Sequence, residues 1–164
     1  MKKIMSVLLI GLLSACASQT TQPTAESTSA ARAETNPNLN PNLNPILKDS
    51  NNILSKRSVY FDYDSFVVKN EYRATVQAHA QYLRDNAAAK VLLQGNADER
   101  GSREYNLALG QKRADSVRSA MTLSGAKDSQ IEAVSLGEEK PRATGHDEAS
   151  WAENRRTDIR YQGE

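Results

Sequence analysis

The fold of this 164-residue chain is decided by residues 90–109, which read KVLLQGNADERGSREYNLAL. The stretch begins with a short apolar run at 90–94 that is typical of a buried strand, and Gly95 closes the run. Ser102 is suited to cap the N-terminus of a helix, and Gly125 to follow its end. The helix between them is predicted by apolar residues at helical spacing, namely Tyr105, Leu109, Val117, Ala120 and Met121. The stretch therefore predicts a strand, a polar loop and a long helix, in that order.

The same alternation extends toward the N-terminus. Residues 58–63, SVYFDY, have the β-branched and aromatic content of a strand. After them, Tyr72, Val76, Ala80 and Leu83 fall at spacings of four, four and three, which is one face of a helix. A strand and a helix are therefore predicted before the central stretch.

The alternation also extends toward the C-terminus. Residues 131–136 and 157–161 each predict a strand, and between them Asp147 is expected to cap a short helix that contains Trp151. The complete order over residues 53–164 is βαβαβ(α)β. This order predicts an α/β domain of the α+β two-layer sandwich type, with helices packed on a mixed four-stranded sheet.

Residues 1–15 are predicted to be the signal peptide of a lipoprotein. Lys2 and Lys3 precede an apolar run of about ten residues, which is too short to span a bilayer core of roughly 30 Å. The run ends in Leu-Ser-Ala-Cys at 13–16, which resembles the bacterial lipobox. We therefore expect Cys16 to become the mature N-terminus. The alternative is an ordinary secretory signal with an incidental cysteine.

The lipobox resemblance implies a covalent N-acyl group and an S-diacylglycerol group on Cys16. Two or more acyl chains hold a protein stably to a bilayer, whereas one chain does so only marginally. Ala17 and Ser18 follow the cysteine where an inner-membrane retention signal usually has Asp, which favours the outer membrane. We expect the lipid to be anchored there and the folded domain to lie in the periplasm.

Residues 16–52 are predicted to be the lipidated N-terminus and a disordered tether. The segment is rich in Asn, Pro, Ser, Thr and Ala, and such a composition buries too little apolar area to offset its ordering entropy. Within it, NPNLNPNLNP at 36–45 repeats every four residues, and the prolines exclude a regular helix. The thirty-six residues from 17 to 52 span at most about 120 Å when extended, and a flexible coil of that length averages roughly 35 Å. The tether can therefore carry a domain well away from a membrane surface.

Composition and charge exclude several function classes. The chain has 21 basic and 20 acidic side chains, of which residues 1–52 hold four and three; the remaining 112 residues therefore hold 17 of each. A domain with balanced, interspersed charges has no field to attract a polyanion, so we expect no nucleic-acid partner. Cys16 is the only cysteine, and the two histidines, His79 and His146, are far apart, so neither a disulfide nor a metal site is predicted.

Asp98 and Arg113 are the candidate binding residues. Asp98 lies after a predicted strand and before a predicted helix, where open α/β sheets tend to bind ligands. Arg113 falls four residues from both Leu109 and Val117, so it points along the apolar face and needs a partner. Asp98 is the nearest candidate, and Asp64 is another. From the pattern alone, an internal ion pair and a ligand-binding site remain equally open.

Residues 58–162 resemble the OmpA-like peptidoglycan-binding domain family, and within it the lipoprotein branch that works with the Tol system. The resemblance rests on motifs in one order along the chain: YFDYD at 60–64, GNADERG at 95–101, EYNLALGQKRA at 104–114, SLGEEKP at 135–141, GHDEA at 145–149 and NRR at 154–156. It implies non-covalent binding of peptidoglycan through the diaminopimelate residue of the stem peptide. Several long motifs in a fixed order make the resemblance specific.

The resemblance also implies roles for individual residues. Asp98 is expected to take the ammonium group of diaminopimelate, and Arg113 its carboxylate. A guanidinium suits that role because it can grip a carboxylate through two parallel hydrogen bonds. Asn106, Asp64 and Arg155 match positions that line the same pocket. No cofactor other than the lipid on Cys16 is implied.

The implied function is to link the outer membrane to the wall, for envelope integrity and for constriction of the outer membrane during division. The implied partners are peptidoglycan, the outer membrane, TolB and other Tol or OmpA-type envelope proteins. Two alternatives are weighed against it. A wall hydrolase could use carboxylates such as Asp62 and Asp64, but no nucleophile–base set can be assembled, so no enzyme is predicted. The same binding domain could instead serve a different envelope complex.

Overall fold

The computed structural model describes residues 45–47 and 49–163. The predicted signal peptide, Cys16 and most of the predicted tether lie outside the described residues. The elements are β1 (Ser58–Tyr60), α1 (Arg73–Asp85), β2 (Val91–Asn96), α2 (Arg103–Leu123), β3 (Ile131–Gly137), α3 (Glu148–Asn154) and β4 (Arg156–Tyr161), with short 3-10 helices at Pro45–Leu47, Ile53–Ser55, Asn70–Tyr72 and Asp128–Gln130. The predicted βαβαβ(α)β order is confirmed.

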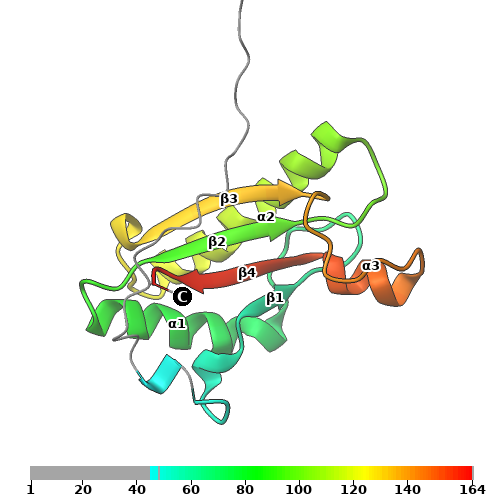
Figure 1. Cartoon of the computed structure of the whole chain (residues 1–164). Helices are drawn as coiled ribbons and strands as arrows, with labels where there is room; N and C mark the ends of the chain where they lie inside the picture. Colours follow the sequence, from blue (N-terminus) through cyan, green and yellow to red (C-terminus); the bar gives the residue numbers. More distant parts are fainter. Residues whose placement is uncertain (1–44, 48, 164) are drawn as a thin grey trace, which may run out of the picture. The chain divides into compact units, whose positions relative to one another are not determined.

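The strands form a four-stranded mixed sheet in the order β1-β4-β2-β3 (Figure 1). β4 is antiparallel to both β1 and β2, while β2 and β3 are parallel and are joined through α2. Two antiparallel steps make β1 run in the same direction as β2. The carboxyl ends of β1, β2 and β3 therefore meet at one edge of the sheet, and the loops that follow them can build a site together.

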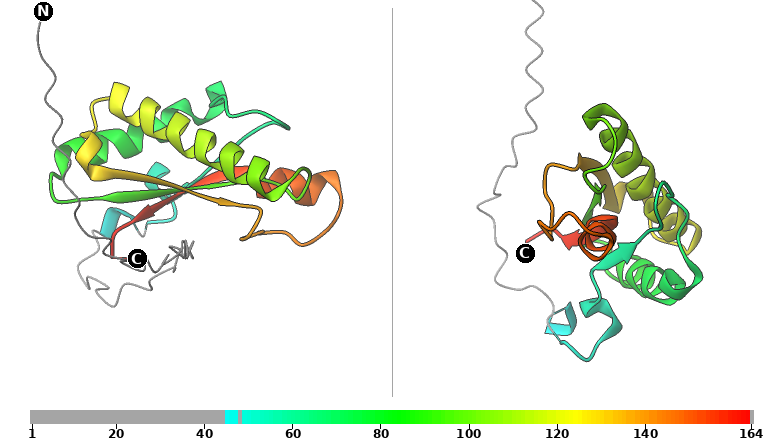
Figure 2. Two further views of the ribbon diagram at one scale, coloured as in Figure 1. Left: turned by 90° about the horizontal axis from the view of Figure 1, so that it is seen from above. Right: turned by 90° about the vertical axis from the view of Figure 1, so that its right-hand side faces the viewer.

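Two helices cover one face of the sheet. In both views of Figure 2, α1 and α2 lie side by side on the same side of the strands. Alternate apolar side chains of neighbouring strands point toward these helices, because successive side chains of a strand point to opposite faces of the sheet. The register places Leu93 opposite Ile159 and Val91 opposite Tyr161, and all four are buried. The predicted two-layer α+β sandwich is confirmed.

The close packing of α2 on β2 depends on two glycines. A Cβ atom at Gly95 would lie 1.9 Å from the carbonyl oxygen of Gly110, and one at Gly110 would lie 2.8 Å from the carbonyl oxygen of Gly95. The helix backbone thus contacts the strand backbone directly. Gly95 was predicted to close the strand, which is wrong: β2 continues through Gly95 to Asn96, with a register shift between the two. The absence of a side chain at Gly95 allows the close contact with α2.

The predicted helix boundaries are confirmed by their caps. The Ser102 hydroxyl accepts a hydrogen bond from the Tyr105 N–H at the start of α2. The Asp147 carboxylate accepts one from the Ser150 N–H at the start of α3, at 2.8 Å. α2 ends at Leu123, two residues before Gly125, as predicted. These caps satisfy N–H groups that a helix leaves unpaired.

Two predicted boundaries differ from the structure. β1 ends at Tyr60 rather than at residue 63, and a turn follows at residues 63 and 64. The packed domain also begins before residue 53, where the tether was predicted to end. Leu47 is buried in the core together with Leu54, and the Leu47 carbonyl accepts a hydrogen bond from the Arg57 side chain at 2.9 Å. No helix within residues 45–47 and 49–163 is long and apolar enough to cross a membrane.

Candidate binding pocket

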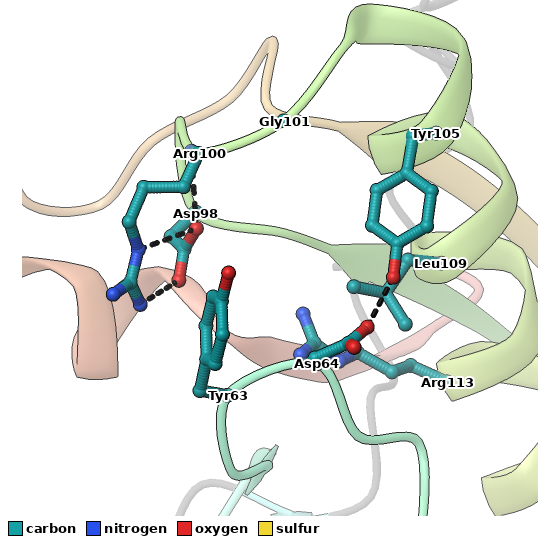
Figure 3. A pocket seen from close by; sticks show the side chains of 8 residues that line it. All are labelled: Tyr63, Asp64, Asp98, Arg100, Gly101, Tyr105, Leu109 and Arg113. Carbon is teal, nitrogen blue, oxygen red and sulfur yellow. Dashed lines mark hydrogen bonds and ion pairs between the residues drawn. The ribbon is translucent and has the colours of Figure 1, made fainter.

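A pocket of about 110 Å³ opens at the edge of the sheet where β1, β2 and β3 end. The loop after β1, the loop after β2 and the first turns of α2 form its walls (Figure 3). Its lining residues are Tyr63, Asp64, Asp98, Arg100, Gly101, Tyr105, Leu109 and Arg113. Four of these eight side chains are charged, two of each sign. The pocket wall therefore carries charges of both signs.

Asp98 lies in the loop after β2 and is only 4% exposed. Its Oδ1 accepts hydrogen bonds from the Arg100 backbone N–H at 3.1 Å and from Arg100 Nε at 3.3 Å. Its Oδ2 accepts one from Arg100 Nη2 at 2.7 Å and one from Arg155 Nη1 at 3.2 Å. Two cationic side chains thus hold the carboxylate in a fixed orientation.

Arg113 projects from α2 and is fully buried. Its guanidinium donates to three backbone carbonyls: Ser65 at 2.8 Å, Asn96 at 2.9 Å and Asp62 at 3.2 Å. It also lies over the Phe61 ring, 5.3 Å from the centroid. An arginine has five N–H groups, so these bonds leave two that the described residues do not occupy. Arg113 is also one of the residues that line the pocket.

The ionisation of both groups follows from these contacts. Burial would raise the pKa of Asp98, but the hydrogen bonds from Arg100 and Arg155 outweigh it and lower the pKa below its ordinary value. Burial lowers the pKa of Arg113 to about 10, with the nearby Asp98 charge opposing the shift. At neutral pH, the pocket therefore holds a carboxylate and a guanidinium, both charged.

Asp64 forms the rim of the pocket on the β1 side. It adopts a positive φ of 51°, a left-handed conformation that Asp tolerates better than most residues. Its carboxylate accepts a hydrogen bond from the Tyr105 hydroxyl, which joins the loop after β1 to α2. In Figure 3 these two residues and Arg113 lie on one side of the Tyr63 ring, and Asp98 lies on the other.

The structure brings three of the five predicted pocket residues together. Asp98, Arg113 and Asp64 line the pocket, whereas Asn106 and Arg155 do not. Asn106 is buried and donates a hydrogen bond to Glu138, toward the loop after β3. Arg155 donates a hydrogen bond to Asp98 at 3.2 Å. Asn106 and Arg155 are thus neighbours of residues that line the pocket, and their roles toward a ligand stay predictions.

Arg155 has a supporting role instead. Its Nε donates to the Phe61 carbonyl at 3.2 Å, and its Nη2 donates to Glu148 at 2.6 Å. Together with the bond to Asp98, these contacts tie the loops after β1 and β2 to α3. Arg155 thus helps to hold the Asp98 carboxylate in place.

Sequence reasoning missed several lining residues. Arg100, Tyr63, Tyr105, Gly101 and Leu109 line the pocket without having been predicted as site residues. Arg100 lies two residues after Asp98, and that short spacing of opposite charges was the available signal. The aromatic side chains carried no such signal because alternation and periodicity had already assigned them to a strand and a helix.

The pocket offers charged, aromatic and hydrogen-bonding groups. Within residues 45–47 and 49–163 no group of three or more His, Cys, Asp or Glu side chains could hold a metal ion. The lining residues supply charges, aromatic faces and hydrogen-bond donors, and they include no Ser, Cys, Lys or His to act as nucleophile or general base.

Comparison with known proteins agrees with this description. The model of the OmpA family matches residues 60–155. The peptidoglycan-associated lipoprotein of Pasteurella multocida is 46% identical over 104 residues, which are 63% of this chain and 69% of that one. The corresponding lipoprotein of Haemophilus influenzae is 48% identical over 104 residues, which cover 63% of this chain and 68% of that one. These relatives are named as lipoproteins and not as enzymes, which confirms the prediction of a non-catalytic protein.

Solved structures show the same fold. The crystal structure of the peptidoglycan-associated lipoprotein from Burkholderia pseudomallei superposes with a TM-score of 0.70 at 62% identity, and covers 71% of this chain and 99% of that chain. The OmpA-like domain of FopA1 from Francisella tularensis superposes with a TM-score of 0.54 at 19% identity and covers 64% of this chain and 72% of that one. The chain therefore belongs to the OmpA family and, within it, to the peptidoglycan-associated lipoproteins.

Proposed function

We propose that this chain is an outer-membrane lipoprotein whose pocket binds peptidoglycan non-covalently, with diaminopimelate of the stem peptide as the recognised residue. The observation that carries the proposal is the presence of Asp98 and Arg113, both buried and both charged, in the wall of one small pocket. The free end of diaminopimelate carries an ammonium and a carboxylate on one carbon. Its two charges match the two signs of the pocket.

The contacts of Arg113 support its role as the carboxylate-binding group. Three backbone carbonyls fix the plane of the guanidinium, and two N–H groups remain for a ligand. A guanidinium held in this way loses little conformational freedom when it binds a carboxylate. Asp98 supplies the opposite charge for the ammonium. A volume of about 110 Å³ accommodates an amino-acid head group but not a disaccharide, so the glycan lies outside the pocket.

The proposal also includes the anchor. The basic start, the short apolar run and the Leu-Ser-Ala-Cys ending support a lipid on Cys16, and the names of the relatives agree with a lipoprotein. A tether between that lipid and a wall-binding domain would hold the outer membrane to peptidoglycan. Replacing Cys16 with Ser should release the protein from the membrane fraction. Retention of the Cys16→Ser protein in washed outer membranes would argue against the lipid anchor.

The role in the Tol–Pal system rests on the motifs shared with the family. TolB is the proposed partner, and the wall and TolB are expected to use overlapping parts of the domain. A saturating diaminopimelate peptide should then weaken TolB binding in a pull-down assay. Unchanged TolB binding would contradict the overlap while leaving wall binding untouched.

Co-sedimentation with purified sacculi tests wall binding directly. The full chain, purified in mild detergent, should sediment with sacculi, and Asp98→Asn should remain in the supernatant. Asp128→Asn is the matched control, because Asp128 is also ion-paired with an arginine, Arg118, but lies outside the pocket. Equal sedimentation of all three proteins would contradict the site. Release of soluble muropeptides by the unmodified chain would instead indicate a hydrolase.

A further inference from the structure

The hydrogen-bonding capacity of Asp98 is already full. A carboxylate offers about four acceptor positions, two on each oxygen. Arg100 fills three of them, through its backbone N–H, Nε and Nη2, and Arg155 fills the fourth. A ligand ammonium can therefore hydrogen-bond to Asp98 only if one of these bonds breaks. A side chain of the protein itself therefore competes with a ligand ammonium for Asp98.

Arg155 is not the side chain whose hydrogen bond to Asp98 breaks. Its side chain is 8% exposed, and it donates to the Phe61 carbonyl and to Glu148 as well as to Asp98. Moving it would break all three bonds and leave a buried charge unpaired, which is costly. Arg155 is part of the framework that holds the loops together.

Arg100 is the side chain that can move away from Asp98. Its side chain is 29% exposed and lines the pocket itself. Its guanidinium lies between two aromatic rings, 4.2 Å from the centroid of Tyr63 and 4.1 Å from that of Trp151. Glu148 lies 3.6 Å from its Nη1. A guanidinium that leaves Asp98 therefore keeps two stacking partners and a carboxylate, and it does not have to return to bulk water uncompensated.

We propose that Arg100 is the specificity-determining gate of the pocket: its guanidinium and the ligand ammonium compete for Asp98, and the ammonium binds when Arg100 moves from Asp98 toward Glu148 while it keeps its contacts with the aromatic rings. The inference rests on the proposed function, since it concerns the same ligand. It has a chemical consequence. A neutral group cannot displace a cation from a carboxylate, so the gate rejects stem peptides whose ammonium has been acylated.

The test is calorimetric titration of the full chain in detergent with a synthetic stem tripeptide that ends in diaminopimelate. Arg100→Met removes the competing charge and keeps the length and apolar contacts of the side chain. Arg155 still keeps Asp98 charged in this variant. We expect Arg100→Met to bind the tripeptide about three- to tenfold more tightly than the unmodified chain, since charge-assisted hydrogen bonds in a part-exposed site no longer compete.

Arg103→Met is the matched control. Arg103 lies three residues later, is largely exposed, pairs with Glu139 at 2.7 Å and does not line the pocket. Its replacement makes the same change in charge and should leave the affinity unchanged. The tripeptide N-acetylated at the side-chain amine is the ligand control, and Arg100→Met should gain nothing for it. Thermal unfolding of Arg100→Met verifies that the variant is folded.

The outcomes separate this inference from the proposed function. Weaker or equal binding by Arg100→Met, with clear binding by the unmodified chain, overturns the gate, and weaker binding identifies Arg100 as a positioning residue for Asp98. Binding by neither protein overturns the proposed function and the gate together. A second readout uses the Arg100 Nε–H resonance, identified by its loss in Arg100→Met. Saturating ligand should shift it and speed its exchange with water, and an unchanged signal contradicts the gate.

Discussion

Asp98 and Arg113 line the same pocket, yet different partners hold them. Asp98 is bound by the side chains of two other arginines, Arg100 and Arg155, and Arg113 is bound by three backbone carbonyls. In the described part of the chain no ion pair joins Asp98 to Arg113. The internal ion pair that the sequence left open is therefore not formed. Each charge is held by its own set of partners.

Arg113→Lys should impair both stability and binding. A lysine retains the charge but cannot donate to the Ser65, Asn96 and Asp62 carbonyls in one plane. We expect a loss of about 3 kcal/mol in the free energy of unfolding, measured by urea denaturation. The affinity for the stem tripeptide should fall at least about tenfold in calorimetry. A variant that is as stable as the unmodified chain would show that the carbonyl contacts contribute little.

The pH dependence of stability should include a contribution from Asp98. Its pKa is lowered in the folded protein, so folding favours the charged form. The stabilisation is therefore fully present above the unfolded-state pKa of about 3.9 and is lost as pH falls through the lower folded value. In thermal unfolding between pH 6 and pH 2, Asp98→Asn should show a shallower decline at the acid end than the unmodified chain. Parallel curves would contradict the assignment.

The pKa values of the two histidines should be shifted in opposite directions. His79 is buried, and burial lowers its pKa to about 4. Its Nε2 lies 3.0 Å from the Lys56 carbonyl oxygen, and its Nδ1 lies 2.8 Å from the Tyr161 hydroxyl. His146 is exposed and hydrogen-bonded to Glu99, which raises its pKa above the ordinary 6.5. An NMR titration of the imidazole protons should give one midpoint near 4 and another above 6.5. Two midpoints near 6.5 would contradict both environments.

These shifts have opposite effects on stability. For His79, stability is lost as pH falls from the unfolded-state value of 6.5 toward about 4, because the unfolded chain binds the proton more readily. A difference of that size corresponds to something on the order of 3 kcal/mol. For His146, the contribution is present below 6.5 and is lost as pH rises through the higher folded value. His146→Ala should remove only this second dependence, as followed by thermal unfolding between pH 6 and pH 9.

Gly95→Ala should destabilise the domain more than any exposed substitution. The new methyl group would meet the backbone oxygen of Gly110 at 1.9 Å, so α2 must move away from β2. We expect a loss of about 3 kcal/mol or more. Gly145→Ala is the matched control, because its methyl group first meets the rotatable hydroxyl of Ser150. Equal unfolding midpoints for the two variants would contradict the direct helix–strand contact.

The elements of this fold follow from local patterns, and the details of the site do not. Helical spacing predicted α1 and α2, residue content and short apolar runs predicted the strands, and side-chain chemistry predicted the caps at Ser102 and Asp147. The four 3-10 helices of the described residues were not predicted. The inward direction of Arg113 was also predicted correctly. Its partners were not, because the carbonyls of Asp62 and Ser65 come from a loop about fifty residues away, and its position depends on the whole sheet.

The role of Arg100 could not be predicted for a related reason. Its contacts with Asp98 are local, but its place in the pocket depends on Tyr63 and Trp151, which come from two other parts of the chain. Arg155 was assigned to the pocket by resemblance, and in the structure it donates a hydrogen bond to the pocket residue Asp98. A motif thus identifies which residues gather at a site, whereas the three-dimensional arrangement determines which of them a ligand can reach.

The most direct test of the account compares two stem tripeptides that differ at one position. One carries diaminopimelate, and the other carries lysine, which keeps the side-chain ammonium and lacks the neighbouring carboxylate. If Asp98 and Arg113 each bind one charge of a zwitterion, calorimetric titration of the full chain should show binding of the diaminopimelate peptide and at least about tenfold weaker binding of the lysine peptide. Equal affinity for the two peptides would contradict the account, because Arg113 would then have no part in recognition.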